Sequence, residues 1–193
     1  MEVSKQALQN IISDEDRLLF AENIPAEYLS DALGRRTGTA DALVFARSTV
    51  LRYANENAIP VTPRGAGTNL VGSTIPLFGG IILDVSRMNR VLELDRDTMT
   101  VTVEPGMLLK DLQAYVEEHG LFYPPDPGEK ASSIGGNIST NAGGMRAVKY
   151  GVTRDYVRGL EVVLADGTVL KVGGKQVKDA SGLSLKHLLI GSE

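Results

Sequence analysis

The spacing of apolar residues indicates helices in the first part of the chain. Apolar residues recur at helical intervals behind Ser4 and again behind Ser13 and Asp16: Leu8, Ile11, Ile12, Leu18, Leu19 and Phe20. Serine is a favoured helix N-cap, and Ser13 followed by Asp16 resembles a second helix start. We therefore expect an N-terminal helical arm over residues 1–38, ending in the linker-like stretch GRRTG.

The pattern changes to short apolar strands from residue 42. ALVFA (42–46) and IPVT (59–62) lie on either side of the helical stretch LRYANEN, which predicts a compact β-α-β unit. GGIILDVSRM (79–88) then supplies a further strand.

Antiparallel pairing is indicated in the second half of the chain. VLELDRDTMTVTVEPG (91–106) alternates apolar and polar residues at period two and reads as two strands joined by a turn. MLLKDLQAYVEEHG (107–120) carries one apolar stripe and ends in glycine, so it predicts a helix. LEVVLADGTVLKVGG (160–174) predicts a hairpin that turns at Asp166 and Gly167.

Composition restricts the class of protein. The 193 residues are 42% hydrophobic and 23% charged, and 20 Lys and Arg against 24 Asp and Glu give a net charge of -4 without a basic block, so nucleic acid is not an expected partner. The absence of cysteine excludes disulfides, zinc-thiolate sites and iron–sulfur clusters within this chain, and no metal site is predicted. With neither a signal peptide nor an apolar run of about 18 residues, we expect a soluble cytoplasmic protein with no transmembrane segment.

The stretch VTPRGAGTNLVGST (61–74) is built like a phosphate-binding loop. It almost fits two nucleotide-binding motifs, but Ser73 replaces the lysine of the triphosphatase loop and Leu70 replaces the third glycine of the dinucleotide fingerprint. What remains is a strand followed by two glycines, whose backbone N–H groups can converge on an anion, with Arg64 as a charged clamp. A surface turn between strands is the alternative interpretation.

A second glycine-rich stretch, YPPDPGEKASSIGGNISTNAGGMRAVKYG (123–151), has neither helical nor strand periodicity over most of its length. Two glycine pairs allow a ligand to approach the backbone, and Asn and Thr side chains offer donors and acceptors to the edge of a ring. The stretch therefore suits a large, flat ligand with polar edges. A glycine-rich connector without a ligand is the alternative.

Together, PRGAGTNLVG, the second stretch, EVVLADGTVL and LLIGSE resemble the FAD-binding domain of the p-cresol methylhydroxylase and vanillyl-alcohol oxidase type. The nearest relatives that the resemblance suggests are the glycolate oxidase FAD subunit and the D-lactate dehydrogenases. The resemblance covers residues 40–193.

The resemblance implies a set of FAD-binding residues in each glycine-rich stretch. The first loop would bind the pyrophosphate through Pro63, Arg64, Gly65, Ala66, Gly67, Thr68 and Asn69. The rest of the cofactor would be lined by Pro125, Asp126, Ser133, Gly135, Gly136, Asn137, Thr140, Asn141, Gly143 and Gly144, with Tyr150 and Gly151 close by. Some members of the family tether FAD to a histidine in the first loop. Residues 65–67 contain no histidine and the chain has no cysteine, so we expect non-covalent FAD.

The implied fold is α+β in two subdomains: a small β-α-β lobe (39–95) and a larger lobe with an antiparallel sheet flanked by helices (96–193), with FAD between them. The chain stops at GSE, where relatives continue into a substrate-binding cap, so the second lobe is expected to be incomplete and no catalytic base is named. The stretch 48–60 also looks shorter than in relatives.

The implied function is the FAD-dependent oxidation of a small 2-hydroxy acid such as D-lactate or glycolate, with an iron–sulfur protein or another electron acceptor as partner. This chain alone is expected to be inactive. Two alternatives remain open: a UDP-N-acetylenolpyruvoylglucosamine reductase, and a nucleotide-binding or electron-transfer subunit without its own substrate site.

Overall fold

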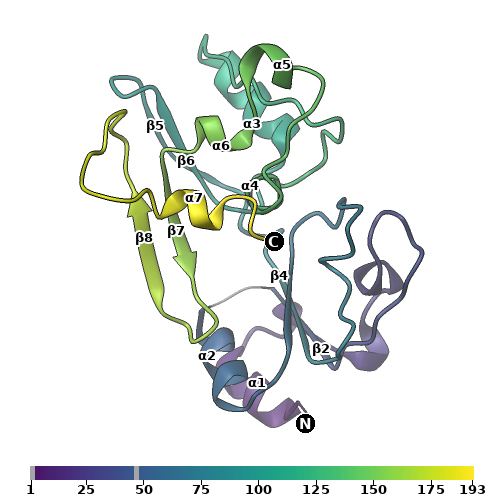
Figure 1. Ribbon diagram of the computed structural model, residues 1–193. Helices are drawn as coiled ribbons and strands as arrows, with labels where there is room; N and C mark the ends of the chain where they lie inside the picture. Colours follow the sequence, from purple (N-terminus) through teal and green to yellow (C-terminus); the bar gives the residue numbers. More distant parts are fainter. Residues whose placement is uncertain (1–2, 46–47) are drawn as a thin grey trace. The chain divides into compact units, whose positions relative to one another are not determined.

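The computed structural model describes residues 3–45 and 48–193, which form two compact units (Figure 1). The first unit comprises Met1–Arg87 and Val163–Val169, and the second comprises Met88–Val162 and Leu170–Glu193. Each unit has its own hydrophobic core. Among the described residues, no helix is both long and apolar enough to cross a membrane.

The first unit is built on a four-stranded sheet with the order β1-β2-β4-β3. β2 (Ala42–Phe45), β4 (Ile81–Asp84) and β3 (Val61–Arg64) are parallel, and β1 (Leu18–Phe20) pairs antiparallel with β2. β2 and β4 are buried at every position, as expected for parallel strands that are covered on both faces. The register aligns Arg64 with Asp84, so all three parallel strands end at one edge of the sheet.

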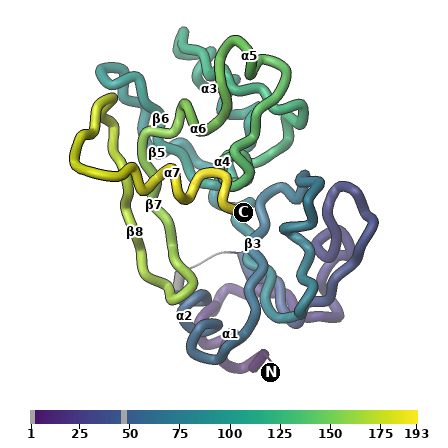
Figure 2. The backbone as a smooth tube through the Cα atoms, viewed as in Figure 1, coloured from purple at the N-terminus to yellow at the C-terminus, as the bar shows by residue number. Residues whose placement is uncertain are grey.

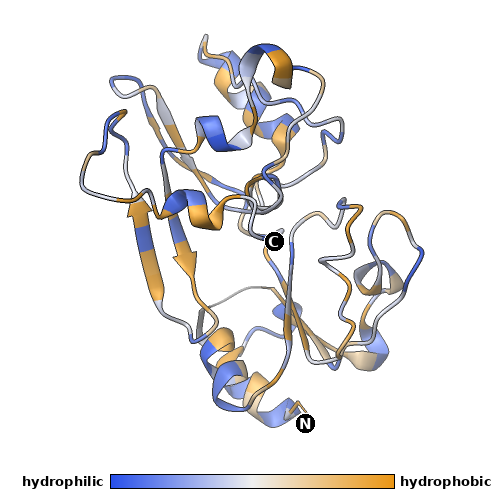
Figure 3. Cartoon of the chain, viewed as in Figure 1, coloured by the Kyte–Doolittle hydropathy of each residue, from blue (hydrophilic) through white to orange (hydrophobic). Residues whose placement is uncertain are grey.

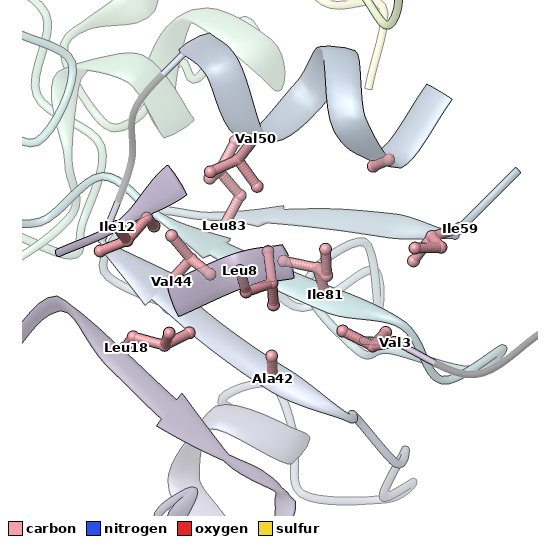
Figure 4. Packing of buried hydrophobic residues seen from close by; sticks show 11 residues of the cluster. Val3, Leu8, Ile12, Leu18, Ala42, Val44, Val50, Ile59, Ile81 and Leu83 are labelled. Carbon is pink, nitrogen blue, oxygen red and sulfur yellow. The ribbon is translucent and has the colours of Figure 1, made fainter. Parts of the chain in front are cut away.

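Two helices cover one face of this sheet. The side chain of Ser4 accepts a hydrogen bond from the N–H of Ala7, which confirms Ser4 as the N-cap of α1 (Lys5–Ile11). α2 (Ser48–Glu56) connects β2 to β3, which confirms the β-α-β unit. Figure 4 shows how the apolar residues of both helices meet the strands in one cluster: Val3, Leu8, Ile12, Leu18, Ala42, Val44, Val50, Ala54, Ile59, Ile81 and Leu83. Ala46, the last residue of the expected strand 42–46, lies outside the described residues.

The predicted second helix of the N-terminal arm was wrong. Residues 18–20 form strand β1, between the single 3-10 turns η1 (Glu15–Arg17) and η2 (Ala21–Asn23), and a third turn, η3 (Ala26–Leu29), follows. Leu18 and Phe20 pack on one face of the sheet and Leu19 on the other, which is the alternation of a strand. The free edge of β2 offers backbone hydrogen bonds to this segment, and pairing with that edge outweighs the local helix signal.

The second unit contains two two-stranded ribbons and several short helices. β5 (Val91–Asp95) pairs antiparallel with β6 (Thr100–Val103), and β7 (Gly159–Val163) pairs with β8 (Val169–Gly173), as both predicted hairpins required. The colours of Figure 3 show one hydrophilic band in an otherwise hydrophobic β8. The helices are α3 (Leu109–Glu118), α4 (Ile134–Ser139), α5 (Ala147–Tyr150), α6 (Thr153–Tyr156) and α7 (Lys186–Leu189).

α3 supplies most of the core of this unit. Leu109, Leu112 and Val116 are buried together with Met107 and Ile134. The helix ends as predicted, because Gly120 has a φ of 71° and donates its N–H to the carbonyl of Glu117. Mixed helix and sheet in both units agrees with the predicted α+β class.

Candidate cofactor-binding site

The first glycine-rich loop leaves β3 at the carboxyl edge of the parallel strands, and Figure 2 traces its irregular path toward β4. In open α/β sheets this edge is where ligands bind. The backbone N–H groups of residues 65–69 form no hydrogen bond with any residue that the structure describes. Five consecutive residues therefore have donors available for an anion, which is what a phosphate-binding nest requires.

Arg64 precedes these donors, and its side chain is directed into the protein. Its side chain is buried, and its two terminal nitrogens donate to the backbone carbonyls of Ser30 (2.9 Å) and Glu27 (2.8 Å). The guanidinium carbon also lies 5.2 Å from the centre of the Tyr28 ring. Burial lowers the pKa of Arg64, while the charge of Asp84 opposes that effect. Arg64 therefore connects β3 to residues 27–30, and its direct contact with a phosphate stays a prediction.

Two further loop residues serve the loop itself. Gly67 has a φ of 70°, and a Cβ at this position would collide with the guanidinium of Arg64. The side chain of Asn69 accepts hydrogen bonds from the N–H groups of Val71 and Gly72 and donates to the hydroxyl of Thr74 at 2.8 Å. Asn69 therefore closes the loop with its side chain, and its backbone N–H remains the group available to a ligand.

The first unit also has a shallow hollow of about 240 Å³, but this hollow is not the predicted site. Its lining contains none of the residues predicted to bind the cofactor, and consists of Asp31, Leu33, Arg35, Arg36, Leu70, Val71, Gly72, Ile75 and Leu77.

The second glycine-rich stretch begins with a buried carboxylate. Pro125 and Asp126 are both buried, and Asp126 forms ion pairs with Lys130 and with Arg146, the latter at 3.2 Å from its Nε. The hydrogen bond from Lys130, together with the two positive charges, holds the pKa of Asp126 below its ordinary value. Its backbone pairs with that of Gly144, so Asp126 joins the two ends of the stretch.

α4 occupies the middle of this stretch, and several of the predicted residues shape it. The hydroxyl of Ser133 caps the helix by accepting the N–H of Gly136, and the hydroxyl of Thr140 donates to the carbonyl of Gly136. Asn141 has a φ of 49°, and its side chain accepts the N–H of Arg154 at 2.9 Å. These three side chains therefore hold the local fold.

Asn137 is the exception. Its side chain is only 5% exposed, and its amide forms no hydrogen bond with any of the described residues. Among the described residues, the fully buried polar side-chain atoms without a hydrogen-bond partner are Ser132 Oγ and Arg154 Nε, so the amide of Asn137 is not sealed from solvent and can bond to a ligand.

The four glycines around Asn137 fall into two classes. A Cβ on Gly135 would lie 2.9 Å from the carbonyl oxygen of Pro105, and a Cβ on Gly144 would overlap the carbonyl of Asp126. A Cβ on Gly136 would meet only the hydroxyl of Ser133 at 3.1 Å, and one on Gly143 would lie 3.3 Å from a methyl group of Val152. A Cβ at 135 or 144 would therefore collide with neighbouring backbone, whereas a Cβ at 136 or 143 would make a tight contact that a small shift of Ser133 or Val152 could relieve.

The stretch ends in a group of aromatic rings. The ring of Tyr150 packs edge-on against Phe122 at 5.9 Å, and its backbone carbonyl accepts the hydroxyl of Tyr156 at 2.6 Å. Gly151 has a φ of 84°, and its Cβ position is filled by Asp155.

Some supporting residues had no signal in the sequence. The backbone carbonyls of Glu27 and Ser30 accept hydrogen bonds from Arg64, and Pro105 packs against Gly135. The hydroxyl of Thr153 donates to the carbonyl of Ala142 at 2.7 Å. The predicted residues thus form two sets, 63–69 in the first unit and 125–151 in the second.

A family model described as "FAD binding domain" matches residues 46–173, which is more than half of the chain. The chain belongs to this family of FAD-binding domains. FAD is therefore its cofactor, as predicted.

Relatives with similar sequences are flavin-linked oxidoreductases. The chain is 48% identical over 172 residues to the glycolate oxidase subunit GlcD of Bacillus subtilis (strain 168), covering 86% of this chain and 37% of that protein. It is 46% identical over 183 residues to a D-lactate dehydrogenase of Anaerostipes hadrus, covering 92% of this chain and 38% of that protein. The FAD-binding chain thus spans less than two fifths of the length of these relatives.

Solved structures confirm the predicted fold. An alkyldihydroxyacetonephosphate synthase superposes with a TM-score of 0.82 at 22% identity, covering 99% of this chain and 38% of that chain. The 4-ethylphenol oxidase of Gulosibacter chungangensis superposes with a TM-score of 0.76 at 27% identity, covering 97% and 40%.

Proposed function

We propose that this chain is the FAD-holding part of a longer oxidoreductase that oxidises a small 2-hydroxy acid such as D-lactate or glycolate. The single observation that carries the proposal is the run of five unpartnered backbone N–H groups at residues 65–69 in a member of an FAD-binding family. The relatives named as glycolate oxidase and D-lactate dehydrogenase support the substrate class.

Residues 65–69 would hold the pyrophosphate of FAD. A protein with a net charge of -4 has no overall field that attracts a diphosphate, so local dipoles must do so. Converging N–H groups supply those dipoles, and the partial exposure of Gly65, Gly67 and Thr68 leaves them accessible to the ligand. Pro63, Ala66 and Asn69 complete this first set.

Residues of the second glycine-rich stretch would hold the remainder of the cofactor. Gly136 and Gly143 have no side chain that would separate the backbone from a ligand, and the amide of Asn137 offers hydrogen-bonding groups that no described residue uses. The other members of the set, from Pro125 to Gly151, support these three through the contacts described above. When bound, FAD supplies the acceptor for a hydride from the substrate.

The cofactor is proposed to be held without a covalent bond. Residues 63–69 contain neither histidine nor cysteine, and the chain contains no cysteine at all. The same composition fits a cytoplasmic protein. The substrate-binding groups, the catalytic base and the contact with an electron acceptor would belong to the longer protein.

Anaerobic mixing tests the proposal in the longer protein. We expect D-lactate or glycolate to bleach the visible absorbance of bound flavin, whereas this chain with bound FAD shows no bleaching with either acid. Bleaching by NADPH and by no 2-hydroxy acid would contradict the proposal and favour a UDP-N-acetylenolpyruvoylglucosamine reductase. Bound flavin that neither reagent reduces would favour an electron-transfer subunit.

A further inference from the structure

We propose that the segment 27–30 holds the phosphate-binding loop in its binding conformation through Arg64, which acts as a positioning residue and not as a phosphate ligand. The segment lies before residue 46 and hence outside the matched family region. This inference rests on the proposed binding of FAD by residues 63–69.

The loop needs support from side chains because its backbone supplies little. The N–H groups of residues 65–69 have no partner among the described residues, so no backbone hydrogen bond that they donate fixes the loop. Two side chains support the loop: Asn69 bonds the far end to Val71, Gly72 and Thr74, and Arg64 lies beneath the near end, against Gly67.

Arg64 connects this near end to a rigid anchor. Its Nη1 and Nη2 atoms donate to the carbonyls of Ser30 and Glu27, which lie 34 and 37 positions earlier in the chain. Tyr28 and Leu29, between those two carbonyls, pack on the core cluster of Ile24, Ala40, Leu43, Phe45 and Ile82. The carbonyl of Leu29 also accepts the N–H of Gly38 at 2.8 Å. The acceptors of the guanidinium are therefore fixed by the core of the first unit.

The guanidinium also shapes the loop from beneath. It fills the space where a side chain at residue 67 would begin, and Gly67 has a positive φ. An arginine fits this role because its planar fork presents nitrogens to two acceptors at once, whereas a lysine has one nitrogen on a flexible stem.

The variant Arg64→Lys distinguishes a residue that positions the loop from a residue that binds phosphate directly. If Arg64 acted through its charge on phosphate, lysine would preserve much of the affinity for FAD. If Arg64 acts through its two hydrogen bonds to Ser30 and Glu27, lysine cannot replace it. We expect Arg64→Lys and Arg64→Ala to raise the Kd of this chain for FAD to a similar extent, about tenfold or more, in a flavin fluorescence titration. Wild-type affinity in Arg64→Lys would overturn the inference.

A double-mutant cycle with Gly67 tests the contact itself. Gly67→Ala places its Cβ against the guanidinium, so we expect it to raise the Kd about tenfold in the wild-type background and less than about threefold beside Arg64→Ala. The strain of a positive φ is common to both backgrounds and cancels. Equal effects in the two backgrounds would overturn the proposed coupling.

Leu8→Ala is the matched control for general destabilisation. Leu8 is buried in the cluster on one face of the sheet, whereas Tyr28 and Leu29, next to the acceptors of Arg64, pack on the cluster of the other face. We expect this variant to unfold at lower temperature than Arg64→Lys and yet to bind FAD with a Kd within about threefold of the wild type. A loss of affinity in Leu8→Ala that matches that of Arg64→Lys would show that stability alone controls retention. Absence of FAD binding by the wild-type chain would instead refute the proposed function.

Discussion

In the first glycine-rich segment, Gly67 has a positive φ and lies against a side chain, the guanidinium of Arg64. In the second segment, Gly135 and Gly144 lie against main chain, at Pro105 and at Asp126. A side chain can move or be replaced, but a backbone carbonyl held in a packed fold cannot. Glycine therefore makes room for a side chain in one segment and for the backbone in the other.

The comparison shows how to identify a glycine that serves a ligand. Gly136 and Gly143 are the two members of the paired glycines at which an added Cβ would keep 3 Å or more from every neighbour. A Cβ there would fit only if Ser133 or Val152 shifted slightly, so packing constrains these two positions less than Gly135 and Gly144, and we propose that they face FAD. A glycine-rich motif alone does not distinguish these two positions from Gly135 and Gly144.

The largest expected effect is that of Gly144→Ala. Its Cβ would overlap the carbonyl of Asp126 at a φ of 115°, so we expect a loss of about 3 kcal/mol or more in the free energy of unfolding. Urea denaturation of the cofactor-free chain measures this loss. Gly128→Ala is the control, because a Cβ there meets nothing within 4 Å and should change stability by less than about 0.5 kcal/mol. Equal stability of the two variants would break the comparison.

Of the adjacent variants, Gly135→Ala should mainly lower stability and Gly136→Ala should mainly weaken FAD binding. Gly135→Ala crowds Pro105 and should cost about 1–3 kcal/mol of stability. Gly136→Ala should stay within about 1 kcal/mol of the wild type, because alanine favours the helix, but should weaken FAD binding about tenfold or more. Denaturation and FAD titration of both variants check this expectation. Unchanged FAD affinity in Gly136→Ala would refute the placement of cofactor at that glycine.

Asp126→Asn tests the ion pairs of the second segment. Losing the pairs with Lys130 and Arg146 should cost about 1 kcal/mol at neutral pH, since both cations are partly exposed. The pKa of Asp126 is lowered on folding, so its stabilising effect is present above the unfolded pKa and is lost as pH falls through the folded pKa. Thermal unfolding against pH measures the difference. Glu161→Gln breaks a more exposed pair with Lys171 and should have a smaller effect.

The smallest effect is expected for Asp84→Asn, near the first segment, and its pH dependence should have the opposite sign. Burial raises the pKa of Asp84 above its ordinary value, with the hydrogen bonds from Ser86 acting against that rise. Wild-type stability relative to the variant is therefore greatest below the unfolded pKa and declines as pH rises through the folded pKa. At neutral pH we expect a difference within about 1 kcal/mol, because asparagine can still accept from Ser86. Parallel pH profiles for the Asp84 and Asp126 variants would contradict the contrast between the two carboxylates.

Local patterns predicted much of the fold. The β-α-β unit, the helix 109–118 and the hairpin at Asp166 and Gly167 each carry their signal within a short window of sequence. Residues 18–20 do not, because three apolar residues in a row have no readable period and their conformation depends on pairing with β2. The position of β3, two residues later than expected, has a similar origin in the register with β4.

The sequence assigns the candidate site to two glycine-rich stretches, and this assignment stays a prediction, but the sequence does not show the contacts of each side chain. The motif drew attention to residues 63–69, yet the contacts of Arg64 are with the backbone carbonyls of Glu27 and Ser30. Every residue type has a backbone carbonyl, so the sequence does not indicate these contacts. The division between Gly135 and Gly136 likewise depends on a contact with Pro105, 30 positions earlier in the chain. Roles that depend on long-range contacts become visible only with the fold.

Titration of the purified chain with FAD, followed by acid precipitation, tests most directly whether this chain binds untethered FAD. We expect saturable quenching of flavin fluorescence and release of all flavin into the supernatant. Flavin that remains in the pellet would contradict the non-covalent attachment. Absence of saturable binding would contradict the assignment of residues 63–69 and 125–151 as a cofactor site that this chain can form.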